Sequence, residues 1–363
     1  GNITHNPRKK IFVNKIQLEH KNSITELTSS KSLNQLDILK TQLKTNLISI
    51  LPEHGHALHE AANFHFKECG KMLRGTTSLA IASALNLNHK TAIHWALAVE
   101  LMHNASLVHD DICDEDSQRR HNPTIFATYG APLAICFGDW LVAKSFEHAA
   151  LASKECKGDT SNVITLLAKV MAKLSSGQAR EFSGGPVLDW TGYDNVVNGK
   201  TVPLLAASVE GPLLLAEKYE YFDDIRRCIE SLGLGYQISN DILDALGKDG
   251  SAEPFNDLYR KAPNAVSITF RDTLKNGHRL EFDNWMIGKT HSNKIDWASQ
   301  ITKNGAIKNC VKQLQEYLEC SRHHRSKLPN ELQQALLPLV TYLEREATKM
   351  CSSTVENDKS SFD

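Results

Sequence analysis

One short acidic stretch constrains this chain more than any other part of its sequence. Residues 107–120 read LVHDDICDEDSQRR and carry five carboxylates within seven residues, followed by two arginines. The stretch continues an apolar segment, VELMHNASLVH, which indicates a mostly buried helix. On that helix Asp110 and Asp114 share one face, where like charges repel each other. Cations are therefore expected nearby, and magnesium, which prefers oxygen ligands, is the first candidate. The alternative is a solvated acidic face, the commoner role of a run of charges.

A second acidic cluster lies about 130 residues further along the chain, in QISNDILDAL. Its spacing places the oxygen-bearing side chains of Asn240, Asp241 and Asp244 on one helix face, again at the end of an apolar segment. Two such helix ends indicate a site in the core of a helix bundle, where facing helices supply the ligands. Basic residues elsewhere are expected to complete a site for a metal-bound phosphate: Lys71, Arg74, Arg119, Arg120 and Lys200, with Arg260 and Lys261 as further candidates.

The remaining pattern predicts an all-α fold. Apolar residues recur at helical spacing between residues 32 and 51, and a long helix is expected to begin at His89 and to run into the first acidic cluster. No segment alternates β-branched and polar residues, so no strands are expected. We therefore predict one large helical domain over residues 31–350, preceded by a flexible arm at 1–30 and followed by a disordered tail at 351–363.

Composition excludes several other classes of protein. Lysine and arginine total 41 against 42 aspartates and glutamates, so no overall field attracts nucleic acid or an anionic membrane. Eight cysteines without a CxxC pair indicate reduced thiols rather than a disulfide framework or a zinc site. No apolar run reaches the roughly 18 residues of a membrane span, and the N-terminal residues do not resemble a secretory signal. We expect a cytoplasmic protein.

These motifs together resemble those of the trans-isoprenyl (polyprenyl) diphosphate synthases. The segment MHNASLVHDDICDEDSQRRHNPT resembles the first aspartate-rich motif of that family, and QISNDILD resembles the second. GKMLR, SSGQ and GKT match further family motifs, so the resemblance covers roughly residues 32–349. It implies an isoprenoid synthase fold, in which a large helical bundle surrounds a deep central cavity, and usually a homodimer. It also implies a magnesium-dependent prenyltransferase that condenses an allylic diphosphate with isopentenyl diphosphate.

The resemblance also assigns roles to individual residues. Up to three magnesium ions would bind the carboxylates of the two motifs, and Lys200 would join them in catalysis. The metal ligands would be Asp110, Asp111 and Asp114 in the first motif and Asn240, Asp241 and Asp244 in the second. The allylic diphosphate would contact Arg119, Lys200, Thr201 and Gln237, and the isopentenyl diphosphate would contact Lys71, Arg74, His103 and Arg120.

Several positions depart from the family pattern. Asn240 stands where the second motif usually begins with Asp, and Glu253 replaces a phosphate-binding lysine, for which Arg260 or Lys261 is expected to compensate. Cys69 and Gly75 replace a Gly and a Pro beside GKMLR. Class I terpene cyclases also have Asn at the first of these positions, which leaves a cyclase, or a prenyltransferase with an unusual acceptor, as the alternative. A third hypothesis is a catalytically weak subunit that tunes an active partner.

Product length is expected to depend on the helix that precedes Asp110. Ala105 and Ser106 lie about one turn before it and are small, whereas short-chain members of the family commonly carry an aromatic ring there. Met102, one turn deeper, would then be the first barrier. We therefore expect a product of twenty carbons or more.

Overall fold

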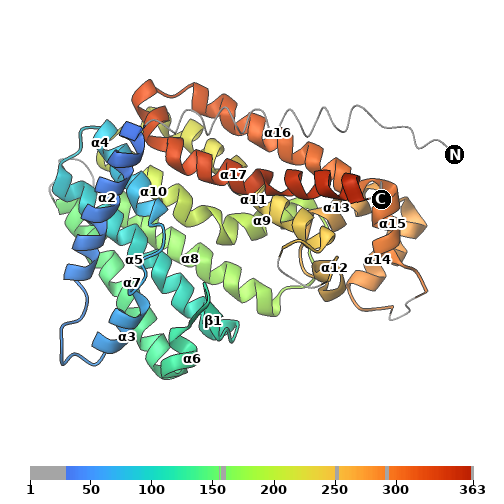
Figure 1. The fold of residues 1–363 in the computed structure, drawn as a ribbon, viewed down its shortest axis with the longest axis horizontal. Coiled ribbons are helices and arrows are strands. Elements are labelled where there is room, and N and C mark those ends of the chain that lie inside the picture. Colours follow the sequence, from blue (N-terminus) through green and yellow to red (C-terminus); the bar gives the residue numbers. More distant parts are fainter. Residues whose placement is uncertain (1–29, 155, 157–160, 250–252, 291–293, 361–363) are drawn as a thin grey trace.

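The structure is a computed structural model that describes residues 30–154, 156, 161–249, 253–290 and 294–360. Long α-helices dominate these residues and confirm the predicted all-α class (Figure 1). The helices in chain order are α2 (Ser30–Ser49), α3 (His59–His65), α4 (Leu73–Ala84), α5 (His89–Cys113), α6 (Ile125–Tyr129), α7 (Ala131–Lys154), α8 (Ser161–Ser183), α9 (Trp190–Lys200), α10 (Val202–Leu215), α11 (Phe222–Leu246), α12 (Asn256–Arg260), α13 (Ala265–Thr273), α14 (Asn276–Met286), α15 (Trp297–Asn304), α16 (Ala306–Ser326) and α17 (Asn330–Ser360), with a 3₁₀ turn at Tyr219–Tyr221.

The helix α5 forms the core of one half of the bundle and packs along α7. It begins at His89, as predicted, because the side chain of Asn88 accepts hydrogen bonds from the N–H groups of Lys90 and Thr91. Deeper in the bundle, the buried Trp95 donates a 3.1 Å hydrogen bond from Nε1 to the carbonyl of Ala207 on α10. The two acidic segments thus end helices whose upstream turns are anchored in the core.

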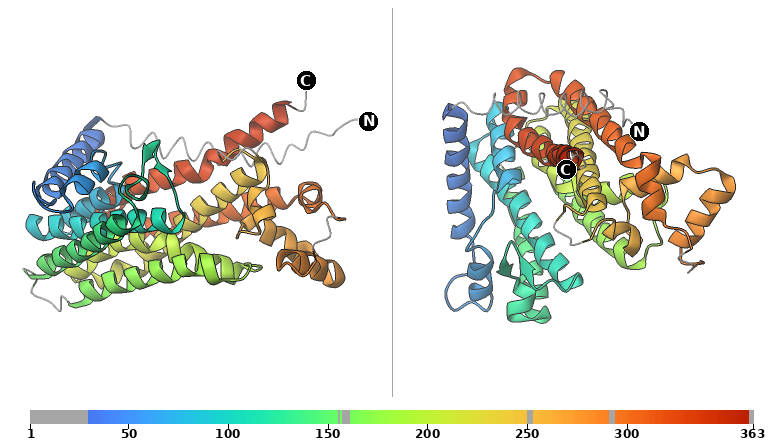
Figure 2. Two further views of the ribbon diagram at one scale, coloured as in Figure 1. Left: turned by 90° about the horizontal axis from the view of Figure 1, so that it is seen from below. Right: turned by 45° about the vertical axis from the view of Figure 1, so that its right-hand side comes forward.

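The second half of the bundle is built around α11, which packs against α16, α17 and α10. Figure 1 shows α16 and α17 along one edge of the molecule, and it shows α12 to α15 at the end opposite to α2 and α4. In Figure 2, α5, α7 and α8 lie side by side and nearly parallel, which agrees with their mutual contacts. The sequence predicted a loop between residues 247 and 264, but the structure also forms the short helix α12 there.

One small sheet departs from the prediction that the chain has no strands. Strand β1 (Gln118–Arg119) pairs with β2 (Asn122–Pro123) in an antiparallel hairpin, with Arg119 opposite Asn122. Its two turn residues, Arg120 and His121, have φ values of 50° and 66°, whereas Asn and Gly are the usual residues of such a turn. The hairpin was missed because this sequence has no turn dipeptide there.

The ends of the predicted domain are only partly described. The helix α17 continues to Ser360 and therefore includes residues 351–360, which are most of the segment for which we predicted a disordered tail. The continuation is understandable because residues 351–360 contain neither Gly nor Pro to stop it. The expected arm lies almost wholly outside the described residues.

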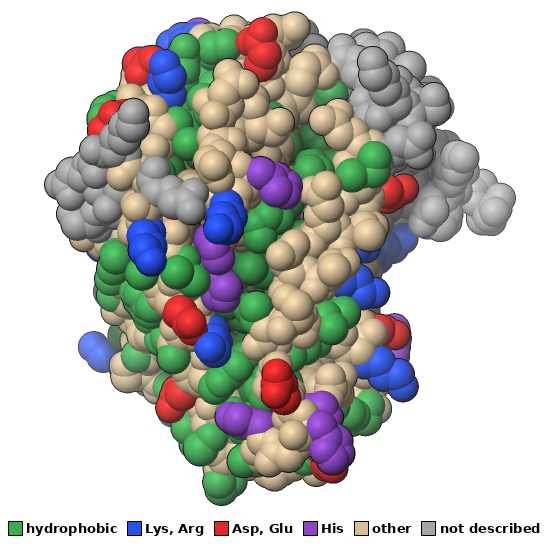
Figure 3. Space-filling view, turned by 90° about the vertical axis from the view of Figure 1, so that its left-hand side faces the viewer, with side chains coloured by type: hydrophobic (Ala, Val, Ile, Leu, Met, Phe, Trp, Pro, Cys, Tyr) green, Lys and Arg blue, Asp and Glu red, His purple; other side chains and the backbone are tan. Residues whose placement is uncertain are grey.

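The surface and the cysteines of the described residues agree with what the composition predicted. Among the described helices, none combines the length and hydrophobicity that a bilayer crossing requires. On the face in Figure 3, basic, acidic and hydrophobic side chains are interspersed outside the grey regions. Every cysteine whose side chain the structure describes is a free thiol.

Candidate active site

The first acidic segment occupies the C-terminal turn of α5. Asp111 is 5% exposed, and both of its carboxylate oxygens accept hydrogen bonds from Arg119, at 3.0 and 2.7 Å. Because β1 begins only a few residues after α5 ends, the hairpin carries Arg119 back over this carboxylate. The C-terminus of a helix already has partial negative charge, so carboxylates there gain from cations. Arg119 supplies one such cation for Asp111.

Asp110 and Asp114 face a different group of charges, on α8 and α9. The pKa of Asp110 is raised to about 6, mainly by burial and also by the carboxylate of Asp114, while the ammonium of Lys200 opposes the shift. Lys200 forms an ion pair with Glu181 and lowers the pKa of Asp114 as well. The structure therefore brings Lys200, at the end of α9, close to the first acidic segment.

The second acidic segment lies in the last two turns of α11. The carboxylate of Asp241 is 2% exposed and accepts three hydrogen bonds from three parts of the chain. The donors are the Tyr193 hydroxyl at 2.6 Å, the Ala265 N–H at 2.9 Å and the Gln237 amide at 3.0 Å. Burial raises the pKa of Asp241 to about 7, although these three donors act in the opposite direction.

Asp244 is less well satisfied than Asp241. Its Oδ2 accepts a 3.0 Å hydrogen bond from the Asp257 N–H, whereas its Oδ1 is buried without a hydrogen-bond partner among the described residues. Burial raises the pKa of Asp244 to about 7, and the carboxylates of Asp257 and Asp249 contribute to the rise. Together with Asn240 and Gln237, Asp241 and Asp244 line a cavity that also contains Lys248 and Lys349.

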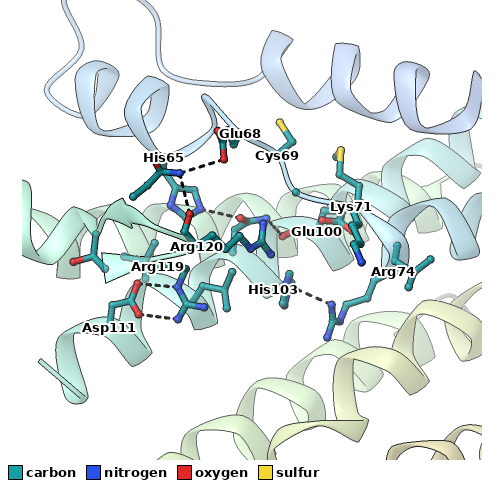
Figure 4. A pocket seen from close by; sticks show the side chains of 18 of the residues that line it. His65, Glu68, Cys69, Lys71, Arg74, Glu100, His103, Asp111, Arg119 and Arg120 are labelled. Carbon is teal, nitrogen blue, oxygen red and sulfur yellow. Dashed lines mark hydrogen bonds and ion pairs between the residues drawn. The ribbon is translucent and has the colours of Figure 1, made fainter. Parts of the chain in front are cut away.

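A second, larger cavity of about 680 Å³ lies between α4, α5, the β-hairpin and α17. Figure 4 shows Lys71, Arg74 and Arg120 around it, with His103 next to Arg74. Nη1 of Arg74 lies 3.4 Å from Nε2 of His103, and the ammonium of Lys71 lies 4.4 Å from the ring centroid of Tyr342. Among the residues that the structure describes, no carboxylate forms an ion pair with Lys71, Arg74 or Arg120, so the cavity fits a polyanionic ligand.

Comparison with known proteins identifies this arrangement. The family model described as polyprenyl synthetase matches residues 56–300. The chain belongs to the polyprenyl synthetase family. This trans-prenyl diphosphate synthase is thus a prenyltransferase of isoprenoid biosynthesis, and the predicted family is confirmed. The family uses a divalent metal and implies prenyl diphosphate substrates.

Individual relatives of the synthase agree with this assignment. A geranylgeranyl pyrophosphate synthase of Geoglobus acetivorans is 30% identical over 73% of this chain and 83% of the relative. The crystal structure of a geranylgeranyl pyrophosphate synthetase from Pyrococcus horikoshii has a TM-score of 0.70 at 25% identity, over 87% of this chain and 99% of that one. A polyprenyl synthase from Caulobacter crescentus, solved with calcium and isoprenyl diphosphate, has a TM-score of 0.64 at 20% identity, over 93% and 98% of the two chains.

Most of the predicted site residues of the synthase gather in the two cavities. The larger cavity is lined by Lys71, Arg74, His103, Asp111, Arg119, Arg120 and Thr201. The smaller one is lined by Gln237, Asn240, Asp241 and Asp244. Lys200 lies near enough to Asp110 and Asp114 for its charge to lower the pKa of both.

Lys261 lies apart from the predicted site residues that line the two cavities. Its ammonium lies 5.0 Å from the ring centroid of Trp285, and Lys261 lines neither cavity. Lys261 is the residue that caps the C-terminus of α12, and its φ is 57°. Arg260 lowers the pKa of Asp257, whose N–H donates to Asp244, and its expected compensation for Glu253 stays a prediction.

The three residues expected to limit product length also lie outside both cavities. Ala105 and Met102 are each 1% exposed and pack in the core, while the Ser106 hydroxyl donates to the carbonyl of His103 at 2.6 Å. Met102 packs in a cluster of buried residues drawn from α5, α7, α8 and α10. Neither cavity reaches these three residues, so their role in product length stays a prediction.

Sequence reasoning missed several residues of the site. Tyr193 binds Asp241, and Glu100, Tyr236 and Tyr342 line the larger cavity. Glu100 carried a detectable signal, because it is a carboxylate inside an apolar helix and lies one turn before His103. The tyrosines carried none, since their contacts join helices that are distant in the sequence.

Proposed function

We propose that this synthase joins isopentenyl diphosphate head to tail to an allylic diphosphate and gives a trans-polyprenyl diphosphate of twenty carbons or more. The observation that carries the proposal is the larger cavity, where Lys71, Arg74 and Arg120 converge apart from the carboxylates of the second acidic segment. A cyclase acts on one allylic diphosphate and has no use for a second group of cations. Asn240 is a feature shared with cyclases, but the basic cavity favours a prenyltransferase more strongly.

Magnesium is the metal that we propose for the two acidic segments. The buried Oδ1 of Asp244 has no hydrogen-bond partner within the described part of the chain. This atom and the raised pKa values of Asp110, Asp241 and Asp244 fit a site whose negative charge a divalent cation would balance. Up to three ions would be held by Asp110, Asp111 and Asp114 on one side and by Asn240, Asp241 and Asp244 on the other. Bound magnesium would neutralise the diphosphate leaving group.

The chain's own residues would bind and orient the two substrates. Lys200, Thr201, Gln237 and Arg119 would contact the allylic diphosphate, while Lys71, Arg74, His103 and Arg120 would hold the isopentenyl diphosphate. The allylic C–O bond breaks and its electron pair leaves with the diphosphate. The isopentenyl double bond then forms the new C–C bond, and loss of a proton to the released diphosphate restores a double bond.

Product length would depend on the side chains beneath the first acidic segment. Ala105 and Ser106 are too small to block a growing chain, and Met102 would be the first large side chain in its path. The name of the Geoglobus relative, a geranylgeranyl pyrophosphate synthase, supports a product of this length. We also propose a homodimer, which a molar mass in solution of twice 40.4 kDa would support and a monomer mass would contradict.

A product assay separates the proposed function from its alternatives. Purified protein receives magnesium, isopentenyl diphosphate and farnesyl diphosphate, and the products are identified by mass spectrometry. Longer prenyl diphosphates are the expected result. A hydrocarbon or alcohol formed without isopentenyl diphosphate would indicate a cyclase, and no turnover would indicate a subunit that depends on an active partner.

A further inference from the structure

The helix α4, which follows the Lys71 segment, receives its N-terminal cap from another helix. Its N-cap residue, Met72, has a φ of 51° and makes no side-chain capping hydrogen bond. Instead, Oε1 of Glu100 on α5 accepts a 2.8 Å hydrogen bond from the N–H of Gly75, in the first turn of α4. The first N–H groups of a helix have no partner within it, and a carboxylate there is also favoured by the helix dipole.

Close packing makes this contact specific to the residues present. A Cβ added at Gly75 would lie 2.8 Å from Cγ of Glu100 and would collide with Leu43 on α2. Any side chain at this position would therefore push α4 away from α5 and lengthen the hydrogen bond. Gly75 allows the carboxylate of Glu100 to reach the backbone of α4.

Glu100 is also placed among the cations of the larger cavity. It is 2% exposed and lines the cavity, and Figure 4 shows it between Arg120 on one side and Lys71 and Arg74 on the other. Burial raises the pKa of Glu100, whereas the Gly75 N–H, Arg74 and Arg120 act in the opposite direction. Burial likewise lowers the pKa of Arg74, and Glu100 opposes that shift.

The two contacts converge on the residues that would receive a diphosphate. Arg74 belongs to the turn of α4 that Glu100 caps, and Lys71 immediately precedes Met72. His103 follows Glu100 by one turn on the same face of α5 and approaches Arg74 at 3.4 Å. One carboxylate thus fixes the position of α4 relative to α5 exactly where both helices meet the cavity.

We infer that Glu100 is a positioning residue, which caps α4 from α5 and thereby holds Lys71 and Arg74 in the arrangement that binds the diphosphate of isopentenyl diphosphate. The inference rests on the proposed function, because it takes isopentenyl diphosphate as the ligand of this cavity. It assigns Glu100 no contact with the substrate. A carboxylate that acted only through its charge would instead repel a diphosphate.

Two neutral variants of similar size separate positioning from charge. Glu100→Gln keeps an oxygen that can accept the Gly75 N–H, whereas Glu100→Met removes it. If Glu100 acts by positioning, the Kd for isopentenyl diphosphate, measured by calorimetry with magnesium, rises about tenfold or more in Glu100→Met and stays within about threefold of wild type in Glu100→Gln. The KM for farnesyl diphosphate stays within about twofold in both.

Glu210→Gln is the matched control for these variants. Glu210 is a carboxylate of 1% exposure on α10 that accepts hydrogen bonds from Arg226 at 2.7 and 3.2 Å, and it lines neither cavity. Its replacement should lower the melting temperature without changing the Kd for isopentenyl diphosphate. An equal change in this Kd in the control and in Glu100→Met would mean that general loss of stability explains the effect, and it would overturn the inference.

The remaining outcomes are equally decisive. Tighter binding of isopentenyl diphosphate in both Glu100 variants, or an unchanged Kd in Glu100→Met, would overturn the inference. If Glu100→Met does not fold, hydrogen exchange of the Gly75 amide in the wild-type protein decides, because isopentenyl diphosphate must slow it. Wild-type protein that binds isopentenyl diphosphate without elongating farnesyl diphosphate contradicts the proposed function alone, whereas wild-type protein that does not bind it contradicts both.

Discussion

The hydroxyl of Tyr193 donates a 2.6 Å hydrogen bond to Oδ2 of Asp241 and so joins α9 to the second acidic segment. Both side chains are almost fully buried, at 1% and 2% exposure. The same helix α9 ends at Lys200, which lies beside the first acidic segment. One short helix therefore connects the two groups of carboxylates.

Tyr193→Phe should lower both stability and metal affinity. Loss of the hydroxyl removes a donor from a buried carboxylate, which costs about 1–3 kcal/mol in the free energy of unfolding. It also removes an influence that lowers the pKa of Asp241, so more magnesium should be needed for half-maximal rate. Denaturant unfolding and a magnesium titration measure the two effects, with Tyr219→Phe, at an exposed tyrosine, as the control. Unchanged values in both measurements would refute the role of this hydrogen bond.

Magnesium affinity should rise with pH. The pKa values of Asp110, about 6, and of Asp241 and Asp244, about 7, lie above the value of 3.8 for the free side chain. The metal-free folded state therefore holds more protons than the unfolded state, and these groups lower stability as pH rises from about 4 to 7. Magnesium needs the deprotonated carboxylates, so its Kd should fall, and the melting temperature it adds should grow, between pH 6 and pH 8. A Kd independent of pH over this range would contradict the prediction.

Asn240→Asp should reduce the magnesium requirement. The amide of Asn240 brings an oxygen but no charge to the cavity that contains Asp241 and Asp244. A carboxylate at this position would bind a hard cation more strongly. The magnesium concentration at half-maximal rate should fall in this variant and remain unchanged in Asn276→Asp, which makes the same change at an exposed position. An identical requirement in all three proteins would show that Asn240 does not limit metal binding.

Ser106→Phe or Ala105→Tyr should shorten the product. Each variant places an aromatic ring about one turn below Asp110, in the path proposed for the growing chain. Mass spectrometry of the products should show fewer isoprene units than wild type, whereas Ser106→Ala should leave the product length unchanged. A Phe or Tyr variant that still makes the wild-type product would place the chain elsewhere.

The acidic segments were predictable because their signal is local. Asp110 and Asp114, or Asp241 and Asp244, are recognised by spacing along a single helix, and the same periodicity located the start of α5 at His89. The β-hairpin was not predictable, because Arg120 and His121 adopt positive φ without the Asn or Gly that usually marks such a turn. The contact of Lys261 with the Trp285 ring was not predictable either, because it joins the end of α12 to α14.

The contacts between helices that are distant in the sequence could not be predicted from the spacing of residues along it. Tyr193 and Asp241 are separated by 48 positions in the sequence, and Glu100 and Gly75 by 25. Both hydrogen bonds help to compensate a buried carboxylate for the loss of water, and their donors come from helices that only the folded core brings together. Such partners depend on how the helices pack together, and the residue spacing within a single helix does not reveal this packing.

The most direct test of the two-substrate account is the rate at which diphosphate is released from farnesyl diphosphate as isopentenyl diphosphate is added. With magnesium present, the account predicts negligible release without isopentenyl diphosphate and a rate that saturates as it is added. Arg74→Met should require far more isopentenyl diphosphate to reach half-maximal release, because Arg74 belongs to the second diphosphate site. Equal rates of release with and without isopentenyl diphosphate would contradict the account and favour a cyclase.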